Sequence, residues 1–332
     1  MNGHTSKFVK ALLALAFAAA LPAHAVDLRI AKQPGLTYLP TIIMEENKLI
    51  EKHAAAMGIK DLNVSWRMFN SGASFNDSLI SGNIDMAVAG TTNLILLWSK
   101  TKGAMKGYAG VGAIPLVLVT RNPNIKTIAD FGGDDRIAVP TVKLSSQAIV
   151  LQMAAEKEWG LPGRDRINAL TVSMGHPDGV IAMLNKSAQI TSHFTMSPYA
   201  EMELKQPGTR KVFTSNDVLG GPMSIAIIFG SVKFHDQNPK VVLAMHAALD
   251  EALELIAKDK EAAAAVYLAN TKDKTALPDM VAMLSAPDMV FSKTPSNTMK
   301  MANYFAHAGY IERAPTDWKE MFFPEVHNLN GD

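Results

Sequence analysis

The 332-residue chain contains no cysteine. This absence excludes disulfide bonds, zinc sites with cysteine ligands, iron–sulfur clusters and catalysis by a thiol. Charge of one sign is not in excess either, because 32 lysines and arginines stand against 31 aspartates and glutamates. We therefore expect no nucleic-acid partner bound through a large basic surface. With 48% hydrophobic and 19% charged residues the chain can bury a core, and its length favours two domains.

A long apolar run lies near the N-terminus. Lys7 and Lys10 precede the apolar stretch Ala11–Leu21, and Ala23-His24-Ala25 has the A-x-A form of a cleavage site. This order is typical of a Sec-type signal peptide. A membrane anchor is the alternative, but a helix of this length spans only about 16 Å of a hydrocarbon core about 30 Å thick. We predict a signal peptide over residues 1–25, removed near Ala25, and a mature protein in the periplasm.

Short apolar runs alternate with stretches of helical spacing over the first two thirds of the mature chain. Strands are predicted at 26–31, 62–69, 84–89, 115–120, 136–139, 170–173, 190–194 and 224–229. Helices are predicted between them at 41–57, 73–80, 144–159 and 180–184. After Pro239 only helical segments follow, at 241–257, 261–268, 276–284 and 297–308. The alternation predicts an α/β fold with parallel strands, and the last part of the chain is predicted to be helical.

Two apolar strands bracket a central α/β block, Pro115–Thr120 before it and Ser224–Phe229 after it. Two such crossings would form a hinge between two lobes, with the second lobe inserted into the first. We expect one lobe to comprise residues 26–116 and 221–332, and the other to comprise residues 117–220.

Four segments carry a resemblance to a known family: Phe69–Gly90, Ile125–Pro140, Val180–Tyr199 and Gly220–Ser231. In their order and spacing they resemble periplasmic substrate-binding proteins of ABC importers for nitrate, sulfonate and taurine-like ligands. That group shares a domain with thiamine-pyrimidine binding proteins. The resemblance implies a two-lobe, type II-like periplasmic binding protein with its ligand in a cleft between the lobes. The chain departs from the family pattern at Ser187–Thr191 and at His193–Tyr199, where the second lobe is expected to face the ligand.

Candidate binding residues follow from the rule that ligands of open α/β sheets lie beyond the carboxyl ends of the strands. The loops at those ends contribute Gln33, Ser71, Gly72, Thr91, Thr92, Thr141, Ser145, Ser146 and His193. Several of these hydroxyls precede helices, whose N-termini carry a partial positive charge and free N–H groups that suit an anion. The alternative is that they only cap their helices. Arg67 and Arg121 are the rival partners for an anion.

His193 follows a predicted strand and could donate a hydrogen bond to an anionic head group, while Phe194 or Tyr38 could cover an apolar tail. The alternative for His193 is a packed or solvated side chain. The other histidines, His176 among them, are scattered without an HExxH pair, so no metal site and no cofactor are predicted.

These observations predict a monomeric transport protein that captures a small anionic organic solute, such as a sulfonate, taurine or nitrate, and delivers it to the membrane permease of an ABC transporter. No chemistry is expected. A sensory binding module is an alternative, as is a pyrimidine or an aromatic carboxylate as ligand. A pyrimidine-synthesising branch related to this family carries a cysteine-rich motif, which this chain lacks.

Overall fold

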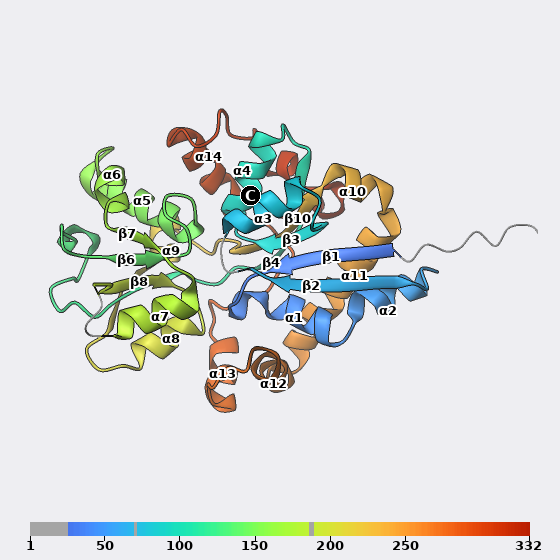
Figure 1. The fold of residues 1–332 in the computed structure, drawn as a ribbon, viewed down its shortest axis with the longest axis horizontal. Coiled ribbons are helices and arrows are strands. Elements are labelled where there is room, and N and C mark those ends of the chain that lie inside the picture. The colour runs from blue at the N-terminus through green and yellow to red at the C-terminus, as the bar shows by residue number, and fades with distance from the viewer. Residues whose placement is uncertain (1–25, 70–71, 186–188) are drawn as a thin grey trace, which may run out of the picture.

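The computed structural model describes residues 26–69, 72–185 and 189–332. It shows two separate five-stranded sheets, each covered by helices (Figure 1). The predicted fold class, a two-lobe α/β protein with a helical C-terminal part, is confirmed. The predicted signal peptide lies outside the described residues. Within them, none of the helices combines the length and the apolar character that crossing a bilayer requires.

The first sheet has the strand order β2-β1-β3-β10-β4. Its strands are β1 (Val26–Lys32), β2 (Leu62–Met68), β3 (Met86–Ala89), β4 (Met105–Gly112) and β10 (Ala226–Ser231). β1 runs parallel to β2 and β3, whereas β10 is antiparallel to both of its neighbours. Every residue of β3 is apolar and buried, as expected for a strand covered by helices on both faces.

Helices pack on both faces of the first sheet. One face carries α1 (Leu39–Glu46), α2 (Leu49–Ala56), α11 (Pro239–Lys258) and α12 (Lys260–Thr271), and the other carries α3 (Gly72–Ile80), α4 (Thr91–Lys100) and α14 (Thr298–His307) (Figure 1). The remaining C-terminal helices are α10 (Val232–Gln237) and α13 (Leu277–Leu284). The predicted helix 41–57 is two helices, because Lys48 takes a left-handed backbone conformation (φ 48°) that ends α1 and precedes α2.

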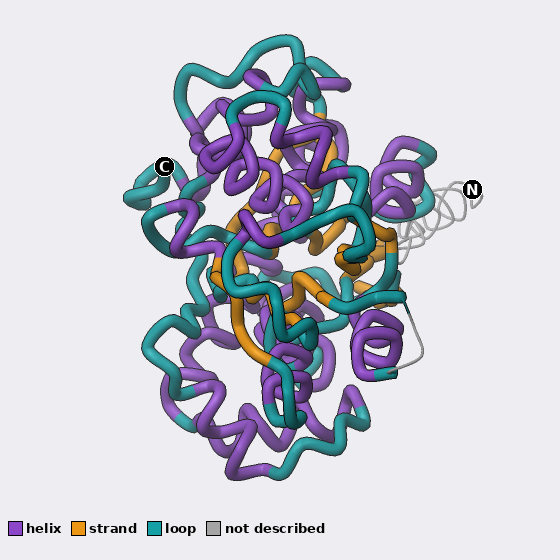
Figure 2. Tube along the Cα trace, turned by 90° about the vertical axis from the view of Figure 1, so that its left-hand side faces the viewer, coloured by secondary structure: helices purple, strands orange, loops and turns teal. Residues whose placement is uncertain are grey.

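The second sheet has the strand order β7-β6-β8-β5-β9. Its strands are β5 (Val117–Thr120), β6 (Ile137–Val139), β7 (Thr171–Ser173), β8 (Ser192–Thr195) and β9 (Arg210–Thr214). Its helices are α5 (Ser146–Trp159), α6 (Gly163–Asn168), α7 (His176–Leu184), α8 (Tyr199–Leu204) and α9 (Ser215–Leu219). Figure 2 views the molecule from the side that lies on the left in Figure 1, where the second sheet is. In this view the strands lie inside and the helices outside.

Within the described ranges there are also four 3-10 turns: η1 (Leu36–Tyr38), η2 (Ile128–Asp130), η3 (Trp318–Met321) and η4 (Pro324–Val326). The chain passes between the sheets twice, from β4 to β5 and from α9 to β10. The two links are tied to their surroundings by backbone hydrogen bonds, from Ser215 N to Leu116 O (2.8 Å) and from Ile225 N to Gly112 O (2.9 Å). We propose that residues 26–116 with 221–332 form one lobe and 117–220 the other, since each range holds all the strands of one sheet.

Candidate functional site

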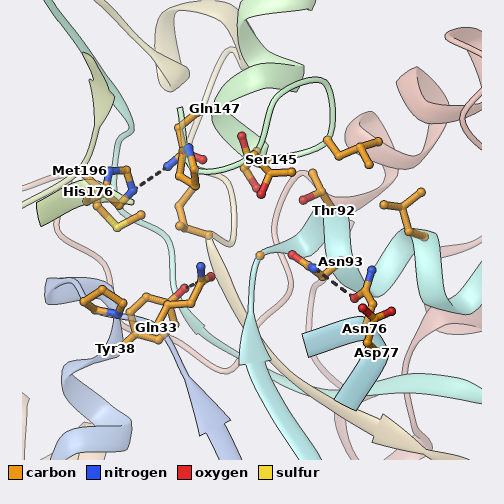
Figure 3. Close-up of a pocket in the computed structure, with 18 of the residues that line it drawn as sticks. Gln33, Tyr38, Asn76, Asp77, Thr92, Asn93, Ser145, Gln147, His176 and Met196 are labelled. Carbon is orange, nitrogen blue, oxygen red and sulfur yellow. Dashed lines mark hydrogen bonds between the residues drawn. The ribbon is translucent and has the colours of Figure 1, made fainter. Parts of the chain in front are cut away.

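A pocket of about 240 Å³ is lined by residues from both sheets and their helices (Figure 3). The first-sheet side contributes Gln33, Pro34, Tyr38, Asn76, Asp77, Gly90, Thr92, Asn93, Leu96, Lys100 and Ile225. The second-sheet side contributes Pro140, Thr141, Leu144, Ser145, Ser146, Gln147, His176 and Met196. The backbone N–H of Leu36 donates to the carbonyl of Ser197 across the two sides, at 3.0 Å.

Three helices begin at the pocket wall. Gly90 precedes α4, Ser145 precedes α5, and His176 is the first residue of α7. The positive ends of their dipoles favour negative charge at this place. Asp77 and Lys100 are the only lining side chains that carry a full charge among the described residues, and their charges balance. The electrostatic character of the wall therefore comes from helix ends and neutral donors and not from an excess of charged side chains.

Gln33 and Tyr38 are among the predicted residues that line the pocket. The Tyr38 hydroxyl donates to Gln33 Oε1 at 3.0 Å (Figure 3). Tyr38 is buried, and this burial raises the pKa of its hydroxyl, which therefore keeps its proton. This hydrogen bond orients the Gln33 amide, whose nitrogen can donate to a ligand.

Ser145 and Ser146 lie side by side in the chain but differ in their partners. Ser145 Oγ accepts from the backbone N–H of Ala148 at 3.3 Å and caps α5. Ser146 is 4% exposed, and its Oγ has no hydrogen-bond partner in the structure. It lies close to Gly90 of the first sheet, where an added Cβ would be 3.3 Å from Ser146 Oγ. Ser146 thus holds an unused donor at the pocket.

Thr92 and Thr141 also line the pocket, as predicted for their loops. Beside Thr92, the amide nitrogen of Asn93 donates to Asn76 Oδ1 at 3.1 Å, which joins α4 to α3 (Figure 3). Thr91 is fully buried and does not line the pocket; its hydroxyl donates to the backbone carbonyl of Ser224. Thr91 therefore fixes the start of α4 and does not face a ligand in this structure.

Four predicted residues remain: Ser71, Gly72, His193 and Phe194. Ser71 lies outside the described residues, and Gly72 begins α3. His193 and Phe194 are fully buried on β8, a central strand of the second sheet, and neither lines the pocket. Phe194 instead packs edge-on against Phe213, with ring centroids 5.6 Å apart.

The two arginines considered as rivals lie elsewhere. Arg67 is on β2 and is not part of the lining, and neither is Arg121. The guanidinium of Arg121 donates to the carbonyls of Asn185 (3.3 Å) and Ile190 (3.2 Å). No group of three or more histidine, aspartate or glutamate side chains that could hold a metal ion is found within the described ranges.

Several pocket residues were not predicted: Asn76, Asn93, Gln147, His176 and Met196. His176 follows the predicted strand 170–173 and opens a helix, so the rule that selected the other loops would have selected it too. Its Nε2 lies 3.1 Å from Gln147 Nε2 (Figure 3). Behind it, His176 Nδ1 lies 3.0 Å from His193 Nε2, and His193 Nδ1 lies 2.6 Å from Glu203 Oε1.

A sequence model of the NMT1-like family matches residues 22–270, about three quarters of the chain. The chain belongs to the NMT1-like family. None of the curated protein sequences compared with this NMT1-like chain matches it.

Solved structures share its fold at low sequence identity. The periplasmic aliphatic sulphonate binding protein SsuA from Escherichia coli has a TM-score of 0.67 and 19% identity, over 92% of this chain and 94% of that one. The alkanesulfonate-binding SsuA from Xanthomonas axonopodis pv. citri, bound to MOPS, has a TM-score of 0.68 and 15% identity, over 90% and 96%. The periplasmic nitrate-binding protein NrtA from Synechocystis PCC 6803 has a TM-score of 0.68 and 16% identity, over 89% and 84%. At these identities the likeness shows that the NMT1-like chain has the periplasmic binding protein fold.

Proposed function

We propose that this NMT1-like protein is the solute-binding component of an ABC import system. It acts in the periplasm after residues 1–25 are removed, binds a small anionic organic solute between its two sheets, and delivers it to a membrane permease. The observation that carries the proposal is the convergence of three helix N-termini and the unpartnered Ser146 hydroxyl on one pocket. The function is binding alone and involves no chemical step.

The energetics favour an anion held without a salt bridge. A helix N-terminus contributes typically about 0.3–1 kcal/mol to an exposed negative group, and up to about 2 kcal/mol in a partly buried site. Three such ends, together with neutral donors from Gln33, Thr92 and Ser146, suffice for a small oxyanion. Apolar lining residues, among them Leu96, Leu144 and Met196, give a short aliphatic tail a place beside the anionic group.

The pocket also limits the size of the ligand and links its binding to closure of the two lobes. Its volume of about 240 Å³ lies below the roughly 300–1,000 Å³ of pockets for drug-sized ligands. Because residues of both sheets line it, a bound solute would contact both lobes and favour the closed arrangement over an open one. The closed form is what a permease would recognise. The structural neighbours SsuA and NrtA, which bind sulfonates and nitrate respectively, support this ligand class.

A second ligand class is favoured by the side-chain amides. Gln33, Asn76, Asn93 and Gln147 line the pocket, and each amide can donate and accept, as the edge of a pyrimidine ring requires. A pyrimidine is therefore the alternative to an anion at the same site.

A thermal-shift screen of the mature chain against ethanesulfonate, taurine, nitrate, benzoate and a hydroxymethylpyrimidine would test the proposal. A ligand at 100 times its dissociation constant stabilises the folded protein by about 2.7 kcal/mol, which raises the melting temperature by several degrees. Stabilisation by ethanesulfonate or another of the anions supports the proposal. Stabilisation by the pyrimidine alone contradicts it. Cell fractionation checks the location: a chain that begins near Val26 is expected in the periplasm, and an uncut chain in the cytoplasm contradicts export.

A further inference from the structure

Four side chains from four elements form a hydrogen-bonded line that starts at the pocket and ends in the interior of the second lobe. They are Gln147 on α5, His176 on α7, His193 on β8 and Glu203 on α8. The contacts are 3.1, 3.0 and 2.6 Å from the pocket inward. Gln147 and His176 line the pocket, whereas His193 and Glu203 are fully buried. The line therefore connects a buried carboxyl group to the place where a ligand would lie, and Figure 3 shows its pocket end, the contact between Gln147 and His176.

Only two directions of hydrogen bonding are self-consistent along this line. A neutral imidazole has one donor nitrogen and one acceptor nitrogen. If Glu203 is ionised it can only accept, so both histidines carry their proton on Nδ1 and His176 Nε2 accepts from the amide nitrogen of Gln147. If Glu203 donates from Oε1, both histidines carry their proton on Nε2, and His176 Nε2 donates to the amide oxygen of Gln147. A half-turn of the Gln147 amide exchanges two atoms of nearly equal size and accommodates either direction.

The surroundings of Glu203 favour the direction in which it donates. Its side chain is fully buried, and Oε2 has no hydrogen-bond partner in the structure. In the part of the chain that the structure describes, His193 is its only ion-pair partner. A buried carboxylate with a single hydrogen bond is costly, so the neutral acid is the stable form. Burial raises the pKa of Glu203 to about 9 and lowers that of His193 to about 3, so this contact is a neutral hydrogen bond near pH 7.

The two imidazole rings are held in place by packing. A Cβ added at Gly179 on α7 would lie 2.6 Å from Cε1 and Nε2 of His193, so α7 lies directly against that ring. The His176 ring is stacked on Tyr199, with centroids 5.6 Å apart and an angle of 23° between the planes. Because neither ring has room to swing, the direction of the line is set by the proton positions.

We propose that Glu203 and His193 are positioning residues that hold His176 in the Nε2–H tautomer, so that Gln147 accepts from His176 and presents its amide nitrogen to the pocket. The pocket end of the line is then a donor. It suits a ligand group that only accepts hydrogen bonds, such as the oxygens of a sulfonate, carboxylate or nitrate, and it selects against an ammonium group at that point. The ligand part of this inference rests on the proposed function, whereas the tautomers do not.

Nuclear magnetic resonance of the ligand-free mature protein tests the tautomers directly. In two-bond ¹H–¹⁵N correlations at pH 7, His176 and His193 should both give the pattern of a neutral Nε2–H imidazole, with assignments from H176N and H193N. The conservative variant E203Q should keep this pattern, because its amide can still donate to His193 Nδ1. E203M has no donor and should lose it. If E203M does not fold, the wild-type spectrum still decides, because Nδ1–H imidazoles at both positions would overturn the proposal.

Calorimetry with ethanesulfonate as the probe tests the consequence for binding. E203Q should bind it with wild-type affinity, whereas Gln147→Met, which removes the donor, should bind it roughly tenfold to a hundredfold more weakly. Unchanged affinity in Gln147→Met would overturn the assignment of Gln147 as a donor to the ligand. If the tautomers are as predicted but neither ethanesulfonate nor nitrate binds the wild type, the proposed function fails and the positioning role of Glu203 stands. If the probe binds but the tautomers are reversed, the proposed function stands and the positioning role of Glu203 fails.

Discussion

Replacing Ser146 with alanine should weaken ligand binding without weakening the fold. Ser146 Oγ is buried at the pocket and has no partner in the ligand-free structure. Removing an unsatisfied buried hydroxyl costs the free protein nothing and relieves a desolvation penalty of about 1–3 kcal/mol at most. A hydrogen bond to a charged group is worth about 1.5–3 kcal/mol. The dissociation constant should therefore rise roughly tenfold to a hundredfold, at 1.4 kcal/mol per decade.

The neighbouring residue supplies a matched control. Ser145 Oγ accepts from Ala148 N at 3.3 Å and caps α5, so Ser145→Ala should lower the free energy of unfolding by about 0.5–2 kcal/mol. The assays are thermal melts of both ligand-free variants and titration calorimetry with the anion that the screen identifies. If Ser146→Ala binds that anion as tightly as the wild type, Ser146 is not a ligand donor. If Ser146→Ala instead melts earlier and Ser145→Ala does not, the roles assigned to the two hydroxyls are reversed.

Three further substitutions test other parts of the structure. Thr91→Val should lower the melting temperature, because the buried carbonyl of Ser224 loses its donor, and should leave ligand affinity unchanged. Weaker binding at an unchanged melting temperature would show that Thr91 contacts the ligand. Gly179→Ala should destabilise the fold by about 1–3 kcal/mol, since the new methyl group would press on His193, and an unchanged melt would contradict that packing. Glu203→Gln should gain stability over the wild type as pH rises. Glu203 in the folded protein keeps its proton up to a pKa of about 9. The unfolded chain loses that proton near pH 4.5, so the wild type loses up to about 1.4 kcal/mol per pH unit between these values. Urea unfolding at pH 5.5, 7 and 8.5 measures the difference, and a constant difference would refute the raised pKa.

The fold class could be predicted because most strands carry an unambiguous apolar signal, as in the fully buried β3. β4 (Met105–Gly112) could not, because Gly107, Gly110 and Gly112 interrupt its apolar pattern. The structure gives the reason for two of these glycines. A Cβ at Gly107 would lie 2.5 Å from the Phe322 ring, and one at Gly112 would lie 2.8 Å from Thr37 Oγ1. Close packing by residues distant in the sequence thus requires glycine where a strand signal would require a β-branched residue.

For the site, the carboxyl-end rule correctly indicated loops that line the pocket, including those of Gln33, Thr92 and Ser146. It could not tell which side chains in those loops face inward, as Thr91 shows. The structure places His193 in the body of β8, where its ring contacts Glu203 and not the pocket. The histidine that reaches the pocket is His176, and only the tertiary contact between β8 and α7 reveals that the two form one unit.

The position of β10 in the first sheet has a consequence for how the protein is made. β10 lies between β3 and β4 and hydrogen-bonds to both, although all five strands of the second sheet precede it in the sequence. A chain that ends before residue 226 therefore lacks the strand that joins β3 to β4 in the first sheet, while the second sheet already has every strand. Pairings between distant segments form slowly, and domains generally fold as units. The first sheet, which contains the earliest strands of the sequence, is thus completed last. A defect that delays folding of residues 117–220 would also delay the pairing of β10 with β3 and β4.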